Sequence, residues 1–400
     1  MISLIHNEIK KLFTRWKSRI LLISFAALVA LIAFGVYQND KMEKEWSKPE
    51  TQIENLEESI KYSEEDLKNS TEEDKKWIQE NIDQMKQDIE VLKNQTTEDY
   101  DAKKDLEARI ENVDFQLKDM EDNNDVYPAG SYKSNLNQEK QLYQYMLDNN
   151  IDPRESTELN AFSYSKSMFM ILGSLFLVAG VIVFAADMVS GEFTPPTMKF
   201  LLTQPVSRAK VLLSKYISLL ITSVLSILSI EIISFVIMGF IFGFGSSNYP
   251  LITGQKYQFD MTKVVDGQHP LVEVAGSSHI ISQGQYTLRL FLFQILFIIA
   301  CVSFAFMIST ILKSSMISMG IGIVSVIVFN IIVAIPYANK IAPFLFTTYG
   351  SGEAIFSGQN AAYMQIPYMT TSFGVIMLIV WSAVCYLIAH FVFVKKDILI

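Results

Sequence analysis

The chain has 400 residues, of which 50% are hydrophobic and only 19% are charged, and its formal net charge is −9. Two or three soluble domains would fit this length, but the apolar residues gather in long blocks, which excludes an ordinary soluble protein. Both cysteines, Cys301 and Cys385, lie within such blocks, which excludes a disulfide framework outside them.

A basic amphipathic segment occupies residues 1–19. Its apolar residues recur at helical spacing between lysines, as in a helix that lies in the membrane interface. A simple topology anchor would explain the same pattern, and both interpretations stay open. The apolar positions are Ile5, Ile9, Leu12, Phe13 and Trp16, and the lysines are Lys10, Lys11 and Lys17.

Six apolar blocks follow, each long enough to cross a bilayer as a helix of roughly 20 residues. The first, at 20–37, exceeds the apolar core of a cleavable signal and is expected to remain as an anchor. Together the blocks predict an all-α membrane protein. They run from Ile20 to Tyr37, Met168 to Ala186, Val211 to Phe244, Leu290 to Leu312, Met316 to Ile335 and Met369 to Val394.

Lysine and arginine predict the orientation, because they accumulate in short cytoplasmic loops. Twelve lie on the side that holds both termini, against four in the opposite short loops. We therefore expect both termini in the cytoplasm of a multi-pass cell-membrane protein. The four on the other side are Lys256, Lys263, Arg289 and Lys340.

Residues 38–167 form an acidic segment between the first two blocks, with 33 acidic and 17 basic side chains, so the rest of the chain carries +7. Two apolar repeats have the four-three spacing of a coiled-coil seam. They predict an extracytoplasmic helical hairpin or three-helix bundle, which either recognises a partner or serves as a solvated spacer. The repeats are Ile78, Ile82, Met85, Ile89 and Leu92, and Leu106, Ile110, Val113, Leu117 and Met120; Thr71 with Asp74 and Thr96 with Asp99 resemble capping boxes.

Two further loops lie on the same side as the acidic segment. Alternating apolar residues around Leu271 and Val272 indicate a small hairpin within 245–287. The semi-polar loop at 336–368 indicates a re-entrant or interfacial segment. Residues 168–400 are thus expected to hold five spans and their loops.

Motifs of common enzymes are missing from the sequence. It has no Walker loop, Gly-rich dinucleotide loop, His-Glu-x-x-His helix or Gly-x-Ser-x-Gly elbow. Its histidines are scattered over both predicted faces. We expect no catalytic, cofactor-binding or metal site and no nucleic-acid partner. The histidines are His6, His269, His279 and His390.

Glu231 is the one carboxylate well inside a predicted span. An acidic residue there costs roughly 2.5 to 3.5 kcal/mol on insertion, so it normally faces protein or a wet path. A stripe of hydroxyls lies on nearly the opposite side of the same helix. We consider Glu231, Ser226 and Ser229 for a translocation path, with helix–helix packing as the alternative. The stripe comprises Ser218, Thr222, Ser226 and Ser229.

A polar loop at 187–210 interrupts the spans on the cytoplasmic side. It starts with acidic residues, holds Thr197-Met-Lys-Phe-Leu-Leu-Thr203 and ends on Pro205-Val-Ser-Arg208, with Lys215 downstream. These residues resemble the permease subunits of type-2 ABC exporters, as does the six-span order behind a basic amphipathic start. Pro196 stands where that family usually has glycine, and the acidic segment exceeds the family minimum.

The resemblance implies that this loop is a coupling helix that docks on a separately encoded ATPase. Glu192 and Arg208 would belong to the docking surface, and Leu201 and Leu202 would be its apolar anchor, with packing under the loop as the alternative for the leucines. Two permease subunits, identical or different, would pair in the lipid bilayer, with the path between them.

Two functions remain in view. The first is a non-catalytic permease of a bacterial ABC exporter for an amphipathic compound, such as an antimicrobial peptide, an antibiotic or a lipid-like molecule, which would link it to antibiotic resistance. The second is a membrane scaffold or receptor-like protein whose coiled external domain recruits partners.

Overall fold

The structure is a computed structural model of the whole chain. It describes residues 1–46, 48–69, 101–123, 129–156, 158–193, 206–262, 269–274, 276–335 and 339–395, with isolated positions between 75 and 89 and at 264 and 267. The predicted capping boxes at Thr71 and Thr96 lie outside the described residues.

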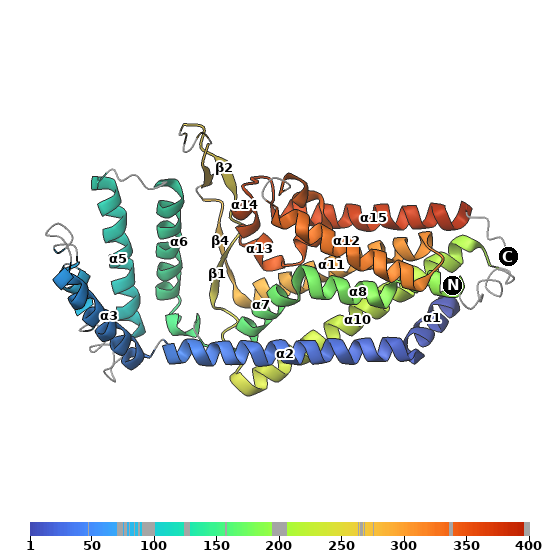
Figure 1. Ribbon diagram of the computed structural model, residues 1–400, viewed down its shortest axis with the longest axis horizontal. Coiled ribbons are helices and arrows are strands. Elements are labelled where there is room, and N and C mark those ends of the chain that lie inside the picture. The colour runs from blue at the N-terminus through green and yellow to red at the C-terminus, as the bar shows by residue number, and fades with distance from the viewer. Residues whose placement is uncertain are drawn as a thin grey trace.

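Among the described residues, six helical stretches are long and apolar enough to cross a membrane, which confirms the predicted number of spans. They lie side by side in an elongated bundle, with α1 and the last turn of α15 at the same end (Figure 1). The stretches are α2 (Trp16–Trp46), the stretch Leu175–Phe193 that includes α8 (Val178–Ala185), α10 (Arg208–Phe242), α11 (Gln283–Ile311), α12 (Ser315–Ala334) and α15 (Thr371–Lys395).

The helix that leads into the second span begins earlier than the apolar block predicted for that span. Helix α7 (Ala161–Leu172) starts at a capping box, in which the Asn160 side chain accepts from the Ser163 amide at 2.9 Å and the Ser163 hydroxyl accepts from the Asn160 amide at 3.0 Å. A π-helical turn, η2 (Gly173–Leu177), then joins α7 to α8. The cap satisfies end amides that hydropathy ignores, so the helix extends beyond the apolar residues.

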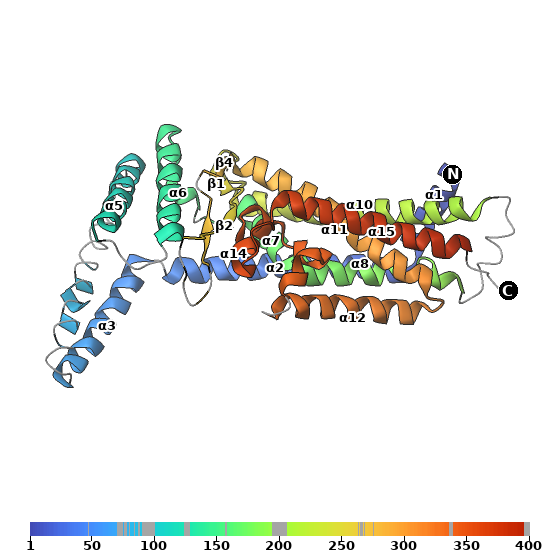
Figure 2. The same cartoon turned by 90° about the horizontal axis from the view of Figure 1, so that it is seen from above.

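Helix α11 is the central helix of the bundle. It packs against α8, α10, α12 and α15, and 67% of its most apolar window is buried, compared with 17% for α10, α12 and α15. Seen from above, α12 lies along one edge of the bundle (Figure 2). A helix that is apolar all round is suited to this buried position, whereas the outer helices expose one apolar side.

Helices α3 (Pro49–Asn69), α5 (Ala102–Asn123) and α6 (Ala129–Asp148) lie beyond one end of α2, outside the bundle (Figure 1). We call residues 38–167 the insert. Ile60 packs with Ile82 and Ile89 in one small core, and Leu106 packs with Met146 in another. Among the described residues, the predicted helical repeats therefore bury apolar positions in two separate contacts.

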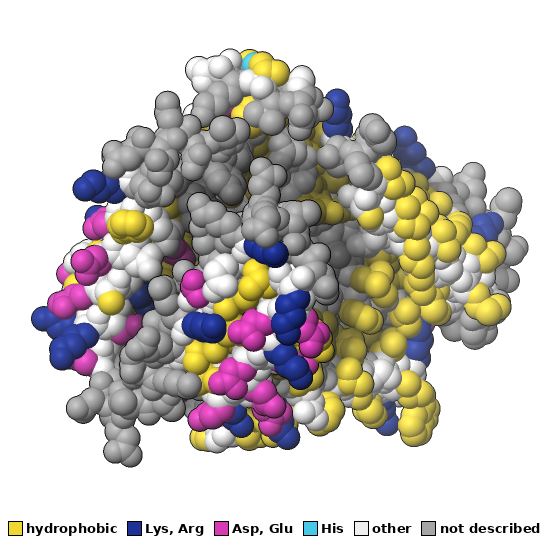
Figure 3. Space-filling view, turned by 60° about the vertical axis from the view of Figure 1, so that its left-hand side comes forward, with side chains coloured by type: hydrophobic (Ala, Val, Ile, Leu, Met, Phe, Trp, Pro, Cys, Tyr) yellow, Lys and Arg dark blue, Asp and Glu magenta, His cyan; other side chains and the backbone are white. Residues whose placement is uncertain are grey.

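Figure 3 shows that charged side chains of both signs cover the described insert helices on this face, while apolar side chains cover the neighbouring bundle. The contrast matches the composition change that the sequence shows near the two ends of the insert.

Two small antiparallel sheets connect the insert with the bundle, so the fold is mostly helical rather than all-α. Strand β1 (Pro250–Thr253) pairs with β4 (His279–Ser282), and β2 (Tyr257–Phe259) pairs with β3 (Leu271–Glu273). This confirms the strand pairing expected within 245–287. Gln138 of α6 donates to the Glu273 carboxylate at 2.5 Å and accepts from Gln255 at 2.7 Å. These bonds attach the insert to the sheets.

The loop before α15 packs against the end of the bundle that carries the two sheets. It contains η4 (Asn339–Phe344), η5 (Phe346–Tyr349), α13 (Gly352–Phe356) and α14 (Gln359–Met364). Phe346 and Tyr349 are fully buried, and the Trp381 indole donates to the Phe344 carbonyl at 2.7 Å. The loop is therefore a packed cap, in line with the expectation that it is not freely solvated.

Candidate functional site

The first helix, α1 (Ile2–Thr14), packs on the start of α10, at the bundle end that holds both termini. Its Leu12 is 2% exposed and faces protein, whereas Phe13 and Trp16, two other apolar positions of the predicted amphipathic segment, are 44% and 76% exposed. Arg15 has an extended backbone and separates α1 from α2. The helix is thus shorter than the predicted segment 1–19.

Lys215 of α10 is the centre of a buried charge network under α1. Its side chain is 1% exposed, and its Nζ lies 3.1 Å from Glu192 and 2.9 Å from Glu8. Lys11 also pairs with Glu192. The two carboxylates and two ammonium groups balance in charge, and the buried members need this balance, because an unpaired buried charge is costly. The Lys11 side chain is 40% exposed, so the network reaches the surface there. We call Glu8, Lys11, Glu192 and Lys215 the buried network.

A backbone contact adds to this attachment. The Ser218 hydroxyl, one turn along α10 from Lys215, donates to the Ile5 carbonyl of α1 at 3.1 Å and to the Ser214 carbonyl at 2.7 Å. Ser218 is fully buried. This member of the hydroxyl stripe therefore holds α1 against α10.

Helix α11 holds the start of the polar loop through one side chain. Ser309 Oγ accepts from the amides of Val189 and Ser190, at 3.0 and 3.1 Å. The short 3-10 helix η3 (Ser190–Phe193) follows and carries Glu192 into the buried network. Three chain segments, α1, η3 and α10, are therefore joined at one point.

Asp187 forms a more exposed pair of contacts beside the buried network. Its carboxylate lies 3.2 Å from Lys17 and 3.6 Å from Arg15. These side chains are 17 to 32% exposed. The basic residues that predicted orientation thus also bind the acidic start of the loop.

The predicted docking residues have different surroundings. Glu192 is 2% exposed beneath α1, so its carboxylate is not on an open surface. Arg208 is the first residue of α10 and is exposed. Leu201, Leu202 and Pro196 lie outside the described residues. Glu192 is therefore buried beneath α1, and Arg208 is exposed at the start of α10.

The three path candidates do not gather in one place. Glu231 is 0% exposed, and its Oε1 accepts from Gln294 Nε2 of α11 at 2.6 Å. Its other oxygen has no hydrogen-bond partner among the described residues. Ser229 is exposed and Ser226 is half-buried. Glu231 therefore faces α11, while Ser226 and Ser229 lie on other sides of α10.

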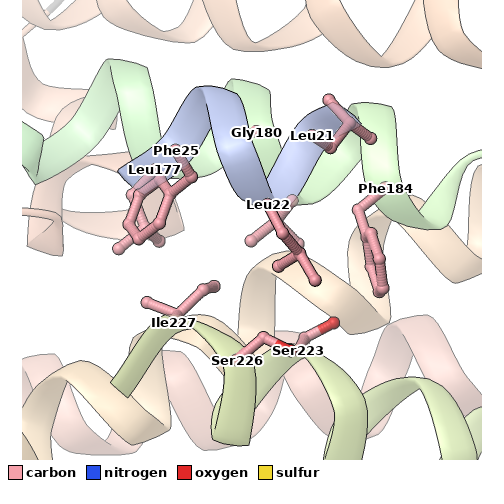
Figure 4. Close-up of a pocket in the computed structure, with 10 residues that line it drawn as sticks. Leu21, Leu22, Phe25, Leu177, Gly180, Phe184, Ser223, Ser226 and Ile227 are labelled. Carbon is pink, nitrogen blue, oxygen red and sulfur yellow. The ribbon is translucent and has the colours of Figure 1, made fainter. Parts of the chain in front are cut away.

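Ser226 lines an apolar pocket between α2, α8 and α10 (Figure 4). Phe25, Leu177 and Phe184 form much of its wall. Ser223 also lines it, and its hydroxyl is buried without a hydrogen-bond partner among the described residues. The pocket can hold an apolar group.

Several partners of these residues were not found from the sequence. Glu8 and Gln294 carry no motif, and Ser223 lies beside the hydroxyl stripe without belonging to it. Glu8 could have been suspected from the sequence, because it is an acidic residue on an otherwise basic helix. Gln294 could have been suspected as an amide inside an apolar block.

Comparison with known proteins supplies a second line of argument. The sequence model of the family described as "ABC-2 family transporter protein" matches residues 2–398. The chain is also similar to "Uncharacterized protein YhcI" of Bacillus subtilis (strain 168), with 24% identity over 292 residues, which cover 71% of this chain and 83% of that protein.

Proposed function

The chain belongs to the ABC-2 family of transporter proteins, and on this premise we propose that it is the permease subunit of an ATP-driven exporter of amphipathic compounds. A domain of this family is a non-catalytic membrane component that works with an ABC ATPase subunit. Membership confirms the family resemblance and the multi-pass membrane character. The exported compound, an antimicrobial peptide, antibiotic or lipid-like molecule, is part of the proposal.

The docking of the ATPase on the loop at 187–210 is the mechanical part of the proposal. The observation that carries it is the buried network, because Lys215 ties α1 and η3 to the helix that follows the loop. A push on the loop would reach α1, α8 and α10 together. Leu201, Leu202 and Arg208 supply the contact surface, and Glu192 supports it from beneath.

The orientation follows from the distribution of lysine and arginine. It places both termini and the loop in the cytoplasm of a bacterial cell and the insert outside. Exposed apolar side chains along α10 and α12 suit contact with lipid and with a second permease subunit. Examples are Phe240 at 80% and Met316 at 82% exposed.

The path is proposed to include the pocket of Figure 4, through Ser226 and Ser223. An apolar wall suits the hydrophobic part of an amphipathic compound, since burial of apolar surface supplies affinity. Ser229 extends the polar side of α10. Glu231 contributes by holding α10 to α11 and by retaining one carboxylate oxygen without a partner among the described residues.

Affinity purification of the intact chain in detergent, with identification of the ATPase and of any lipid or peptide that accompanies it, tests the proposal. Leu201→Glu, Leu202→Glu or Arg208→Glu should each abolish ATPase co-purification, because charge is placed in an apolar groove or reversed. Lys340→Glu, an exposed cation at the opposite end, is the matched control. Unchanged co-purification and transport in all three variants would refute docking and favour a scaffold that recruits partners through the insert.

A further inference from the structure

A polar pocket lies at the insert-bearing end of the bundle, opposite the buried network. It forms where the β1–β4 sheet meets the starts of α11 and α15, and its cavity volume is about 330 Å³. Basic and hydroxyl side chains dominate its wall, including Lys256, His279, Arg289, Ser277, Thr371 and Ser372. We call it the basic pocket.

The backbone around the basic pocket is tightly held. The Gly254 amide and the Thr253 hydroxyl both donate to the Phe356 carbonyl, at 2.8 and 3.1 Å. Gly254 has a φ of +83°, and a Cβ there would lie 2.6 Å from the His279 ring. Only glycine lets the histidine approach in this way. The Lys256 amide donates to the Ser277 hydroxyl at 3.0 Å, which joins the two edges of the pocket.

The charge of the basic pocket is not balanced. No carboxylate lines it, and neither Lys256 nor Arg289 forms an ion pair within the described part of the chain. The carboxylates of neighbouring elements are engaged elsewhere, since Glu353 pairs with Lys166 at 2.8 Å and Glu273 accepts from Gln138. The positive N-terminal end of α15, at Thr371, adds to the field. An anion is therefore the ligand that this site favours.

The position of the basic pocket along the spans indicates which kind of anion it binds. Arg289 immediately precedes the apolar part of α11, and the side chains of Leu288 and Leu292 beside it are 60% and 58% exposed. Ile376, one turn into α15, is 56% exposed. Cations thus stand at the edge of an exposed apolar surface, as a lipid headgroup and its acyl chains require. Arginine and lysine are also the usual partners of phosphate.

We propose that the basic pocket binds a phosphate-bearing anion, with Lys256 and Arg289 as its charged partners and the neighbouring hydroxyls as hydrogen-bond donors. The source of this anion is either the headgroup of an anionic phospholipid or free phosphate. The site lies far from the loop at 187–210, and its ligand binding is measured on this chain alone. Failure of ATPase docking would therefore leave this inference untouched, and the reverse also holds.

The test uses the full chain, delipidated in a neutral detergent, and isothermal titration with three probes. Dioctanoyl-phosphatidylglycerol carries phosphate and acyl chains, dioctanoylglycerol carries the same chains without phosphate, and inorganic phosphate has no chains. The variants are Arg289→Gln and Lys256→Gln, with Lys340→Gln as a control cation at the same end. Thermal unfolding of each variant checks that the fold is kept.

Loss of one charged hydrogen bond should raise the Kd of phosphatidylglycerol about ten-fold in each pocket variant. The control should bind as the wild type does, and dioctanoylglycerol should bind much more weakly. Equal Kd values for inorganic phosphate and phosphatidylglycerol, both raised by the variants, would identify free phosphate as the source. Equal binding of the two lipids, wild-type affinity in both pocket variants, or no binding of either phosphate probe would overturn the proposal.

Discussion

At the end of the bundle that holds both termini, Lys215 is 1% exposed and is shared by Glu192 and Glu8. At the opposite end, Lys256 and Arg289 are exposed and pair with no carboxylate in the part of the chain that the structure describes. Both ends are rich in cations, but Lys215 holds helices of its own chain together, whereas Lys256 and Arg289 form no such ion pair among the described residues.

The difference follows from desolvation. A charge that leaves water must recover its solvation from partners, so the buried network is complete and its members depend on one another. A charge that stays in water costs little and stays available to a ligand. Burial therefore separates cations that hold the fold from cations that can bind.

The largest effect is expected from Lys215→Met. Removal of this ammonium takes from the Glu8 and Glu192 carboxylates the cation that they share, and breaking such a network costs about 3 to 5 kcal/mol. The free energy of unfolding in detergent measures the loss. Lys210→Met removes an exposed cation five positions away and should change the free energy of unfolding by less than about 0.5 kcal/mol. Equal effects of the two variants would show that the network is not a structural support.

The buried pair in the middle of the bundle should give a smaller effect. Gln294→Leu removes the bond to Glu231 and should cost about 1 to 3 kcal/mol, because the carboxylate loses its partner. The double variant Glu231→Leu with Gln294→Leu should recover most of this loss. A stable double variant with lost substrate-stimulated ATPase activity would assign the pair to transport, whereas retained activity would assign it to packing.

The exposed contacts of Asp187 allow exposed and buried ion pairs to be compared at the same end of the bundle. Asp187→Asn should cost only about 0.2 to 1 kcal/mol, although it removes the contacts to both Lys17 and Arg15. At roughly 1 M salt the effect should vanish, because screening acts over about 3 Å there. Unfolding at low and high salt measures this. A loss as large as that of Lys215→Met would contradict the role assigned to burial.

The smallest effect on stability is expected at the basic pocket. Arg289→Gln should leave the free energy of unfolding within about 0.5 kcal/mol of the wild type, since no ion pair is broken. The same variant should lose anion affinity, so stability and binding separate at this end. A large destabilisation would mean that Arg289 supports the fold, and the contrast between the two ends would fail.

Much of the architecture could be predicted from local patterns. Span number follows from apolar length, and the helical insert follows from four-three spacing at Ile78 to Ile89 and at Leu106 to Leu117. Span limits were less accurate, because the capping box at Asn160 and Ser163 extends α7 beyond its apolar block. The paired strands amended the all-α expectation, since short strands form through partners that lie far apart in the sequence.

At the candidate site, the sequence and the structure contribute different information. The sequence marked Glu231 as unusual, because an acidic residue within a span is costly, and the family resemblance marked Glu192, Arg208 and Lys215. It could not give their partners. Glu8 and Lys215 lie 207 positions apart, and Glu231 and Gln294 lie 63 apart.

The sequence by itself determined that this chain crosses a membrane, resembles a transporter permease and carries a polar loop between spans, because these follow from local composition and short motifs. Only the tertiary structure decided which charges are buried and paired, as at Lys215, and which remain open, as at Arg289. The physical reason is that desolvation and pairing depend on how helices pack, and packing joins residues whose positions in the chain are unrelated.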